Sequence, residues 1–90
     1  MTADRPAQIR ARLEQALAPV RLDIEDESHL HAGHAGSREG KGHFSVRIVS
    51  DRFAGQTPIA RHRMVYAALA ELMQTDIHAL SIDAQAPDET

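Results

Sequence analysis

The chain has 90 residues, of which 42% are hydrophobic and 26% are charged, and its formal net charge is −3 with neutral histidines. This length accommodates one hydrophobic core, so we expect a single domain over residues 1–90. No apolar run reaches the roughly 20 residues that a membrane-spanning helix requires, and the first residues lack the apolar segment of a signal peptide. The absence of cysteine excludes disulfides and thiolate ligands from this chain. We expect a cytoplasmic protein.

The charges are unevenly distributed along the chain. Residues 38–63 hold six basic side chains against two acidic ones, whereas residues 64–90 hold five acidic side chains and no lysine or arginine. The locally basic middle suits a phosphate or an acidic partner, and the alternative is an ordinary solvated surface. The overall acidity weakens the case for non-specific binding to nucleic acid.

The first half of the chain predicts one helix and two strands. Ile9, Leu13 and Leu17 recur every four residues, which is typical of an amphipathic helix over residues 6–17. Residues 22–26 and residues 44–48 alternate apolar and polar side chains, the pattern of half-buried strands. We expect these two strands to pair antiparallel, with a long histidine- and glycine-rich loop between them at residues 28–42.

The second half predicts another helix and a third strand. Thr57 offers a capping hydroxyl and Pro58 suits the first helical turn, so a helix is expected from there to about Met73. Residues 78–84 are expected to form the third strand, followed by a short polar tail at residues 85–90. The expected buried face of the helix consists of Ile59, His62, Val65, Leu69, Leu72 and Met73.

The predicted order of elements is α-β-β-α-β, which indicates an α+β fold. Three strands with one apolar face need cover, and two amphipathic helices packed on that face provide it. The second helix can act as a crossover connection, so the three-stranded sheet is expected to be mixed, with one parallel pair.

The loop between the first two strands holds three of the six histidines in a glycine-rich segment at residues 28–36. Neutral imidazole is a good ligand for borderline metal ions, and His31 and His34 are three residues apart. These two residues are therefore candidate ligands for zinc or nickel. The alternative interpretation is a flexible polar loop whose histidines cluster without binding a metal.

The remaining histidines have structural interpretations. Position alone favours His78 as a strand-edge residue on the same face as Leu80, although the first residue of a strand can also be exposed. His62 is expected to be packed on the buried side of its helix, and His43 to lie at the surface. The chain contains no nucleophile elbow, phosphate-binding loop or dinucleotide motif, so we expect no enzyme activity.

Five segments, taken in order and spacing, resemble the BolA family over nearly the whole chain. They are residues 26–28, 43–44, 48–55, 61–66 and 77–80, which read DES, HF, IVSDRFAG, RHRMVY and IHAL. The resemblance implies a fold similar to class II KH domains, with three strands and helices on one face. That fold agrees with the element order predicted from the residue patterns.

The resemblance implies an iron–sulfur adaptor. BolA-like proteins pair with monothiol glutaredoxins and share a bridging [2Fe–2S] cluster, to which the glutaredoxin cysteine and a glutathione thiol are ligands. The histidine that the family supplies near its C-terminus corresponds to His78, and a second ligand comes from the first strand-to-strand loop. Counting forward from Glu27 gives His31, whereas counting back from His43 gives His34, which its flanking glycines favour slightly. Such a protein acts in cluster transfer or in iron or redox sensing, and the isolated chain is expected to carry no cluster.

The resemblance also implies an alternative function, because some BolA-like proteins are described as DNA-binding transcriptional regulators. In that case Arg52, Arg61 and Arg63 would contact phosphates or a partner. The turn at residues 54–57 has one glycine where a KH phosphate clamp has two, and stacking aromatics on a strand are lacking. The adaptor is therefore the preferred hypothesis, ahead of DNA-binding regulation and of simple metal binding by the loop.

Overall fold

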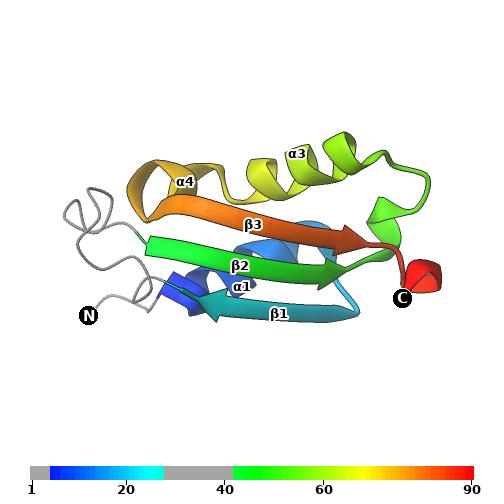
Figure 1. Ribbon diagram of the computed structural model, residues 1–90, viewed down its shortest axis with the longest axis horizontal. Helices are drawn as coiled ribbons and strands as arrows, with labels where there is room; N and C mark the ends of the chain where they lie inside the picture. Colours follow the sequence, from blue (N-terminus) through cyan, green and yellow to red (C-terminus); the bar gives the residue numbers. More distant parts are fainter. Residues whose placement is uncertain (1–4, 28–41) are drawn as a thin grey trace.

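The computed structural model describes residues 5–27 and 42–90 (Figure 1). Within these residues, no helix is both long enough and apolar enough to cross a bilayer. The order of helices and strands confirms the predicted α+β arrangement. In chain order the elements are α1 (Arg5–Leu17), β1 (Arg21–Asp26), β2 (Gly42–Val49), the 3-10 helix η2 (Asp51–Phe53), α3 (Pro58–Ala68), α4 (Ala70–Thr75), β3 (Ile77–Gln85) and the 3-10 helix η3 (Pro87–Glu89).

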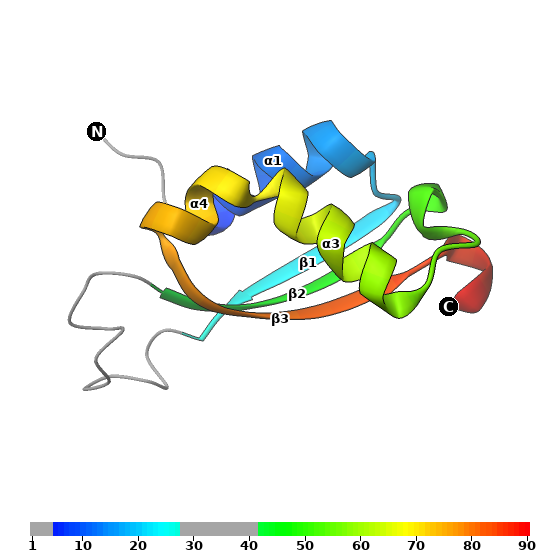
Figure 2. The ribbon, with the colours of Figure 1, turned by 90° about the horizontal axis from the view of Figure 1, so that it is seen from above.

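The three strands form one mixed sheet in the order β1-β2-β3. β1 pairs antiparallel with β2, with Leu22 opposite Ile48, and β3 pairs parallel with β2. A parallel pair needs a connection that returns to the same end of the sheet, and α3 and α4 provide it. Helices α1, α3 and α4 all lie on one face of the sheet (Figure 2). Both predicted pairings and the one-sided helical cover are confirmed.

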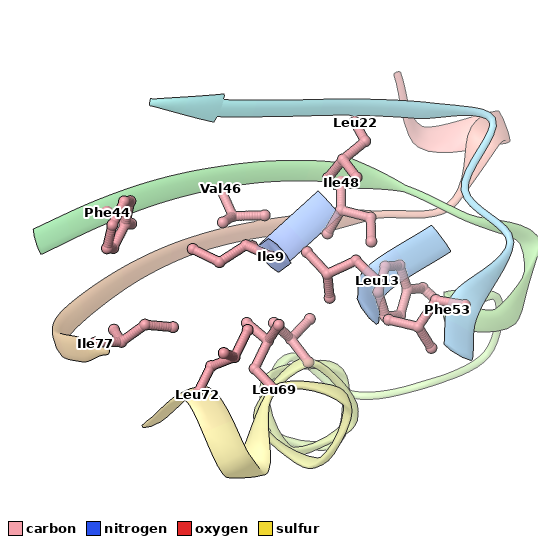
Figure 3. Close-up of a cluster of buried hydrophobic side chains, with 12 residues drawn as sticks. Ile9, Leu13, Leu22, Phe44, Val46, Ile48, Phe53, Leu69, Leu72 and Ile77 are labelled. Carbon is pink, nitrogen blue, oxygen red and sulfur yellow. The ribbon is translucent and has the colours of Figure 1, made fainter. Parts of the chain in front are cut away.

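The core lies between this face of the sheet and the helices (Figure 3). The apolar stripe of α1, which recurs every four residues, is buried as predicted. Alternate residues of β2 face it, because successive side chains of a strand point to opposite faces of the sheet. Phe44 and Phe53 are the only aromatic side chains in this cluster of buried residues, so aliphatic contacts dominate it. Its members are Ile9, Leu13, Leu17, Leu22, Phe44, Val46, Ile48, Phe53, Val65, Leu69, Leu72 and Ile77.

Helix α3 is rotated relative to the prediction. Val65 and Leu69 are buried as expected, but Ile59 is 66% exposed and His62 is exposed, so the predicted burial of these two residues is wrong. Apolar residues occur on every side of α3, and periodicity therefore cannot define one buried face. The inward position in the first turns is taken by Arg61, whose guanidinium donates to the carbonyl oxygen of Ala84 on β3.

The helix predicted from Thr57 to Met73 is also divided. Its start is confirmed, because the Thr57 hydroxyl accepts a hydrogen bond from the Ala60 N–H at 3.1 Å. At Leu69 the backbone leaves the helical range, with φ −105° and ψ 14°. The Leu69 N–H still bonds to the Val65 carbonyl at 3.1 Å, so hydrogen bonding reaches the junction before α4 begins.

Candidate functional site

Three chain segments meet at one end of the sheet. β1 ends there at Asp26, while β2 and β3 both begin there (Figure 1). The Glu27 N–H donates to the carbonyl oxygen of His43, and the Gly42 N–H donates to that of Asp76, each at 2.8 Å. The two residues that flank residues 28–41 are therefore fixed at this end. His31 and His34 lie outside the described residues.

A β-bulge determines the direction of His78. Gly42 pairs with Ile77, but the next residue of β2, His43, pairs with Ala79, so β3 has one extra residue at this point. Ile77 is 2% exposed and belongs to the core, whereas His78 and Ala79 are both exposed. A bulge interrupts strict alternation and re-aims the side chain beside it. The prediction from position that His78 lies on the face of Leu80 is therefore wrong, and the exposed alternative is confirmed.

The buried neighbour of His78 is a second histidine. The ring centroids of His43 and His78 are 5.1 Å apart, and the ring planes are inclined at 57°. His43 is only 6% exposed and its Nε2 is enclosed by the protein, so its predicted surface position is wrong. The sequence pattern predicts no functional role for His43. The predicted topology could have indicated the contact between the two histidines. The parallel strands β2 and β3 begin side by side, and the second residue of each is a histidine.

The exposed imidazole of His78 is the group at this end of the sheet whose chemistry suits a metal ion. An exposed imidazole can bind a metal ion through one of its ring nitrogens. Within residues 5–27 and 42–90, no group of three or more histidine, aspartate or glutamate side chains is arranged to hold a metal ion. A metal bound to His78 therefore needs ligands from outside the described residues or from another molecule.

The three candidate arginines have different environments. Arg52 in η2 and Arg63 in α3 are exposed. The side chain of Arg61 is only 12% exposed, and its two terminal nitrogens donate to the two carboxylate oxygens of Glu89 at 2.5 and 2.7 Å. Its Nε donates to the Gln56 carbonyl at 2.9 Å. The guanidinium of Arg61 is thus occupied by contacts within this chain.

Glu89 is held by these contacts and by one more. Its Oε1 accepts a hydrogen bond from the Ala86 N–H at 2.9 Å. The hydrogen bond from Arg61, followed by the one from the Ala86 backbone, lowers the pKa of Glu89 from 4.5 to about 2. The polar tail predicted over residues 85–90 is therefore ordered into β3 and η3 and attached to α3. We call the contact between Arg61 and Glu89 the C-terminal latch. It touches β3 at Ala84, six residues or roughly 20 Å along the strand from His78.

The sheet face opposite the helices carries charges that are paired. Arg47 lies 3.3 Å from Asp83, and Arg21 lies 3.0 Å from Asp23. A hollow of about 410 Å³ on this face is lined partly by the side chains of these pairs. Exposed pairs of this kind contribute little to stability, and each arginine already has a carboxylate beside it. We assign no ligand to this surface.

Comparison with known proteins identifies the family. The family model described as BolA-like protein matches residues 13–89. The chain therefore belongs to the BolA family, as its sequence motifs predicted. The solved BolA domain of SufE1 from Arabidopsis thaliana superimposes with a TM-score of 0.86 at 43% identity and covers all of both chains.

Two curated relatives differ in how they are named. BolA-like protein 1 of Mus musculus is 49% identical over 81 residues, which is 90% of this chain and 57% of that protein. The DNA-binding transcriptional regulator BolA of Escherichia coli strain K12 is 45% identical over 75 residues, which is 83% of this chain and 69% of that protein. The chain thus spans little more than half the length of the mouse relative. Both names describe BolA-like proteins or regulators and neither describes an enzyme.

Proposed function

We propose that this protein is an iron–sulfur adaptor that shares a [2Fe–2S] cluster with a monothiol glutaredoxin and glutathione, acting in cluster transfer or in iron or redox sensing. The observation that carries the proposal is the exposed His78. The bulge in β3 directs this imidazole out of the core. It lies at the end of the sheet where β1 ends and β2 begins, and residues 28–41 connect these two strands. Membership of the BolA family supports the same role.

The ligands of this chain fit a shared cluster better than a resident one. A [2Fe–2S] cluster takes four protein or thiol ligands. This chain has no cysteine, and its described residues hold no group of three potential ligands. We propose that His78 and one loop histidine, His34 or His31, complete a set in which the glutaredoxin and glutathione supply the thiolates. Imidazole in place of thiolate raises the reduction potential of such a cluster.

The test is visible circular dichroism of the mixed proteins. The purified chain is added to cluster-loaded monothiol glutaredoxin with glutathione, and the spectrum is compared with that of the glutaredoxin alone. We expect a new spectrum that saturates at one to one. His78→Ala should abolish or shift it, whereas His62→Ala, which changes an exposed histidine on α3, should leave it intact. An unaltered glutaredoxin spectrum with the wild-type chain would contradict the proposal.

The same spectrum distinguishes the two loop candidates. His34→Ala and His31→Ala are compared in the heterodimer, with all other conditions held constant. We expect the larger spectral change from His34→Ala, because the spacing back from His43 and the flanking glycines favour that residue. A change confined to His31→Ala would assign the ligand to His31 instead.

DNA binding is the second candidate function, favoured by the name of the Escherichia coli relative. Of the three candidate arginines, Arg52 and Arg63 are exposed and can contact phosphates, whereas Arg61 is occupied by Glu89. We expect the paired change Arg52→Ala and Arg63→Ala to weaken any mobility shift of duplex DNA and to reduce its salt dependence. The absence of a wild-type shift near physiological salt would count against this function.

A further inference from the structure

The contact between His43 and His78 has a consequence for how the exposed imidazole is held. We propose that His43 is a positioning residue: its buried ring packs against the ring of His78 and fixes the direction in which the His78 imidazole points. The inference deepens the proposed function and rests on it only where a bound cluster is concerned. The contact itself belongs to the free protein and can be tested there.

The backbone at His43 is held by hydrogen bonds to neighbouring segments. The His43 carbonyl accepts the Glu27 N–H, and the preceding Gly42 donates to the Asp76 carbonyl, each at 2.8 Å. Its ring centroid lies 5.1 Å from that of His78 with the planes inclined at 57°. This spacing and tilt fall within the range in which aromatic rings attract one another. The side chain of His43 therefore forms a fixed surface for its neighbour.

His78 needs such a surface more than an ordinary strand residue does. It is the extra residue of a bulge and it is exposed, so the helices do not hold its side chain. A ligand that is free to change rotamer loses that freedom when it binds a metal, and this loss weakens binding. A ring already held in one orientation loses less, which is the usual contribution of the groups that support a metal ligand.

The burial of His43 separates this role from that of a ligand. The Nε2 atom of His43 is enclosed by protein, and the residue as a whole is 94% buried, since only 6% of it is exposed. A metal ion or a partner cannot reach that nitrogen while the ring stays buried. His78 is exposed and His43 supports it, so the two histidines perform different tasks.

The first experiment uses nuclear magnetic resonance on the free chain. The order parameter and the ring-proton shifts of the His78 imidazole are measured in the wild type, His43→Ala, His43→Phe and the control His62→Ala. We expect the order parameter to fall in His43→Ala, to be restored in His43→Phe, which retains a buried ring, and to be unchanged in His62→Ala. An unchanged His78 ring in folded His43→Ala, or no restoration by folded His43→Phe, would overturn the inference.

A reciprocal measurement covers the case in which the variants at His43 do not fold. Removal of the exposed ring in His78→Ala should shift the ring-proton resonances of His43, because the centroids of the two rings are 5.1 Å apart. The fold of that variant is checked by its far-ultraviolet circular dichroism. Unmoved His43 resonances would show that the rings do not pack in solution and would overturn the inference.

The second experiment uses the heterodimer with cluster-loaded glutaredoxin. We expect His43→Ala to weaken formation of the shared cluster about 10-fold, as is usual for groups that support a metal ligand, and His43→Phe to recover most of the loss. A wild-type mixture without a new spectrum would contradict the proposed function but would leave the magnetic resonance result as the test of positioning. A wild-type spectrum that His43→Ala leaves unchanged in titration would overturn the inference alone.

Discussion

The surroundings of His78 and Arg61 differ from what their neighbours along the chain predict. His78 follows the buried Ile77 but is exposed, because the bulge places both it and Ala79 off the core. Arg61 lies among residues expected to contact a partner, yet its guanidinium is bound to Glu89. In both cases a contact with a distant part of the chain decides the role of the side chain.

The pair formed by Arg61 and Glu89 predicts a pH dependence of stability. The folded state holds the pKa of Glu89 at about 2 instead of 4.5, so folding favours the ionised carboxylate. A lowered carboxyl pKa contributes stability that is complete above pH 4.5 and is lost as the pH falls towards 2. We expect Glu89→Gln to unfold at lower urea than wild type at pH 6, and the difference to shrink steadily between pH 5 and pH 2.

A double variant serves as the control for this measurement. In an Arg61→Gln background the carboxylate has lost its main partner, so Glu89→Gln should produce a much smaller, nearly pH-independent change. A Glu89→Gln effect of equal size in both backgrounds would show that the ion pair is not its cause.

At the scale of elements, α3 is the helix whose orientation the residue pattern did not define. Its apolar residues lie on every side, and its inward face is selected by the contacts that Arg61 makes with β3 and by the packing of Val65 and Leu69. The helix is therefore placed by its partners, and its own amphipathicity is weak. By contrast, α1 has one regular apolar stripe, and that stripe is the buried one.

Two substitutions test which face of this helical region is buried. Ile59 is 66% exposed and Leu69 is 1% exposed. We expect Ile59→Lys to change the free energy of unfolding by no more than about 0.5 kcal/mol, as for other surface positions. Leu69→Ala should lower it by about 2–5 kcal/mol, since it leaves a cavity in the core. Urea unfolding measures both, and a large loss from Ile59→Lys would show that Ile59 is buried, as the sequence pattern predicts.

At the scale of the whole molecule, His78 lies at one end of the sheet and the contact between Arg61 and Glu89 at the other. His78 is the second residue of β3, whereas Arg61, which is bound to Glu89, contacts Ala84 close to the end of the strand. The end with His78 is also where β1 ends and β2 begins, the two strands that residues 28–41 connect. The two features share no residue, so they can be altered by separate substitutions.

The composition of the molecule predicts that it cannot hold a cluster without a partner. The chain has no cysteine, and its described residues contain no group of three potential metal ligands. We expect the isolated protein to remain colourless after anaerobic incubation with iron, sulfide and glutathione. The same incubation with a monothiol glutaredoxin present should give visible absorption. A stable cluster spectrum from the isolated chain, checked by its iron and sulfide content, would contradict the shared-cluster proposal.

Local residue patterns were sufficient for the order of the elements, both strand pairings, the stripe of α1 and the family. Each of these depends on periodicity, caps or short motifs that lie within a few residues of one another. The loop histidines His31 and His34 remain a prediction from spacing, since they lie outside the described residues. The burial of Val65 and Leu69, four residues apart, was also predicted, although the same pattern wrongly placed Ile59 and His62 on the buried face.

The direction of His78, the burial of His43 and the occupation of Arg61 became known only from the tertiary structure. An extra residue in β3 reverses the outcome of alternation, and nothing in the local sequence marks where a parallel strand will shift its register. His43 is buried by packing at the meeting point of strands that begin 35 residues apart. Arg61 is bound by a residue 28 positions later. Pairing between distant segments depends on how the whole chain packs, which is why local periodicity could not predict it.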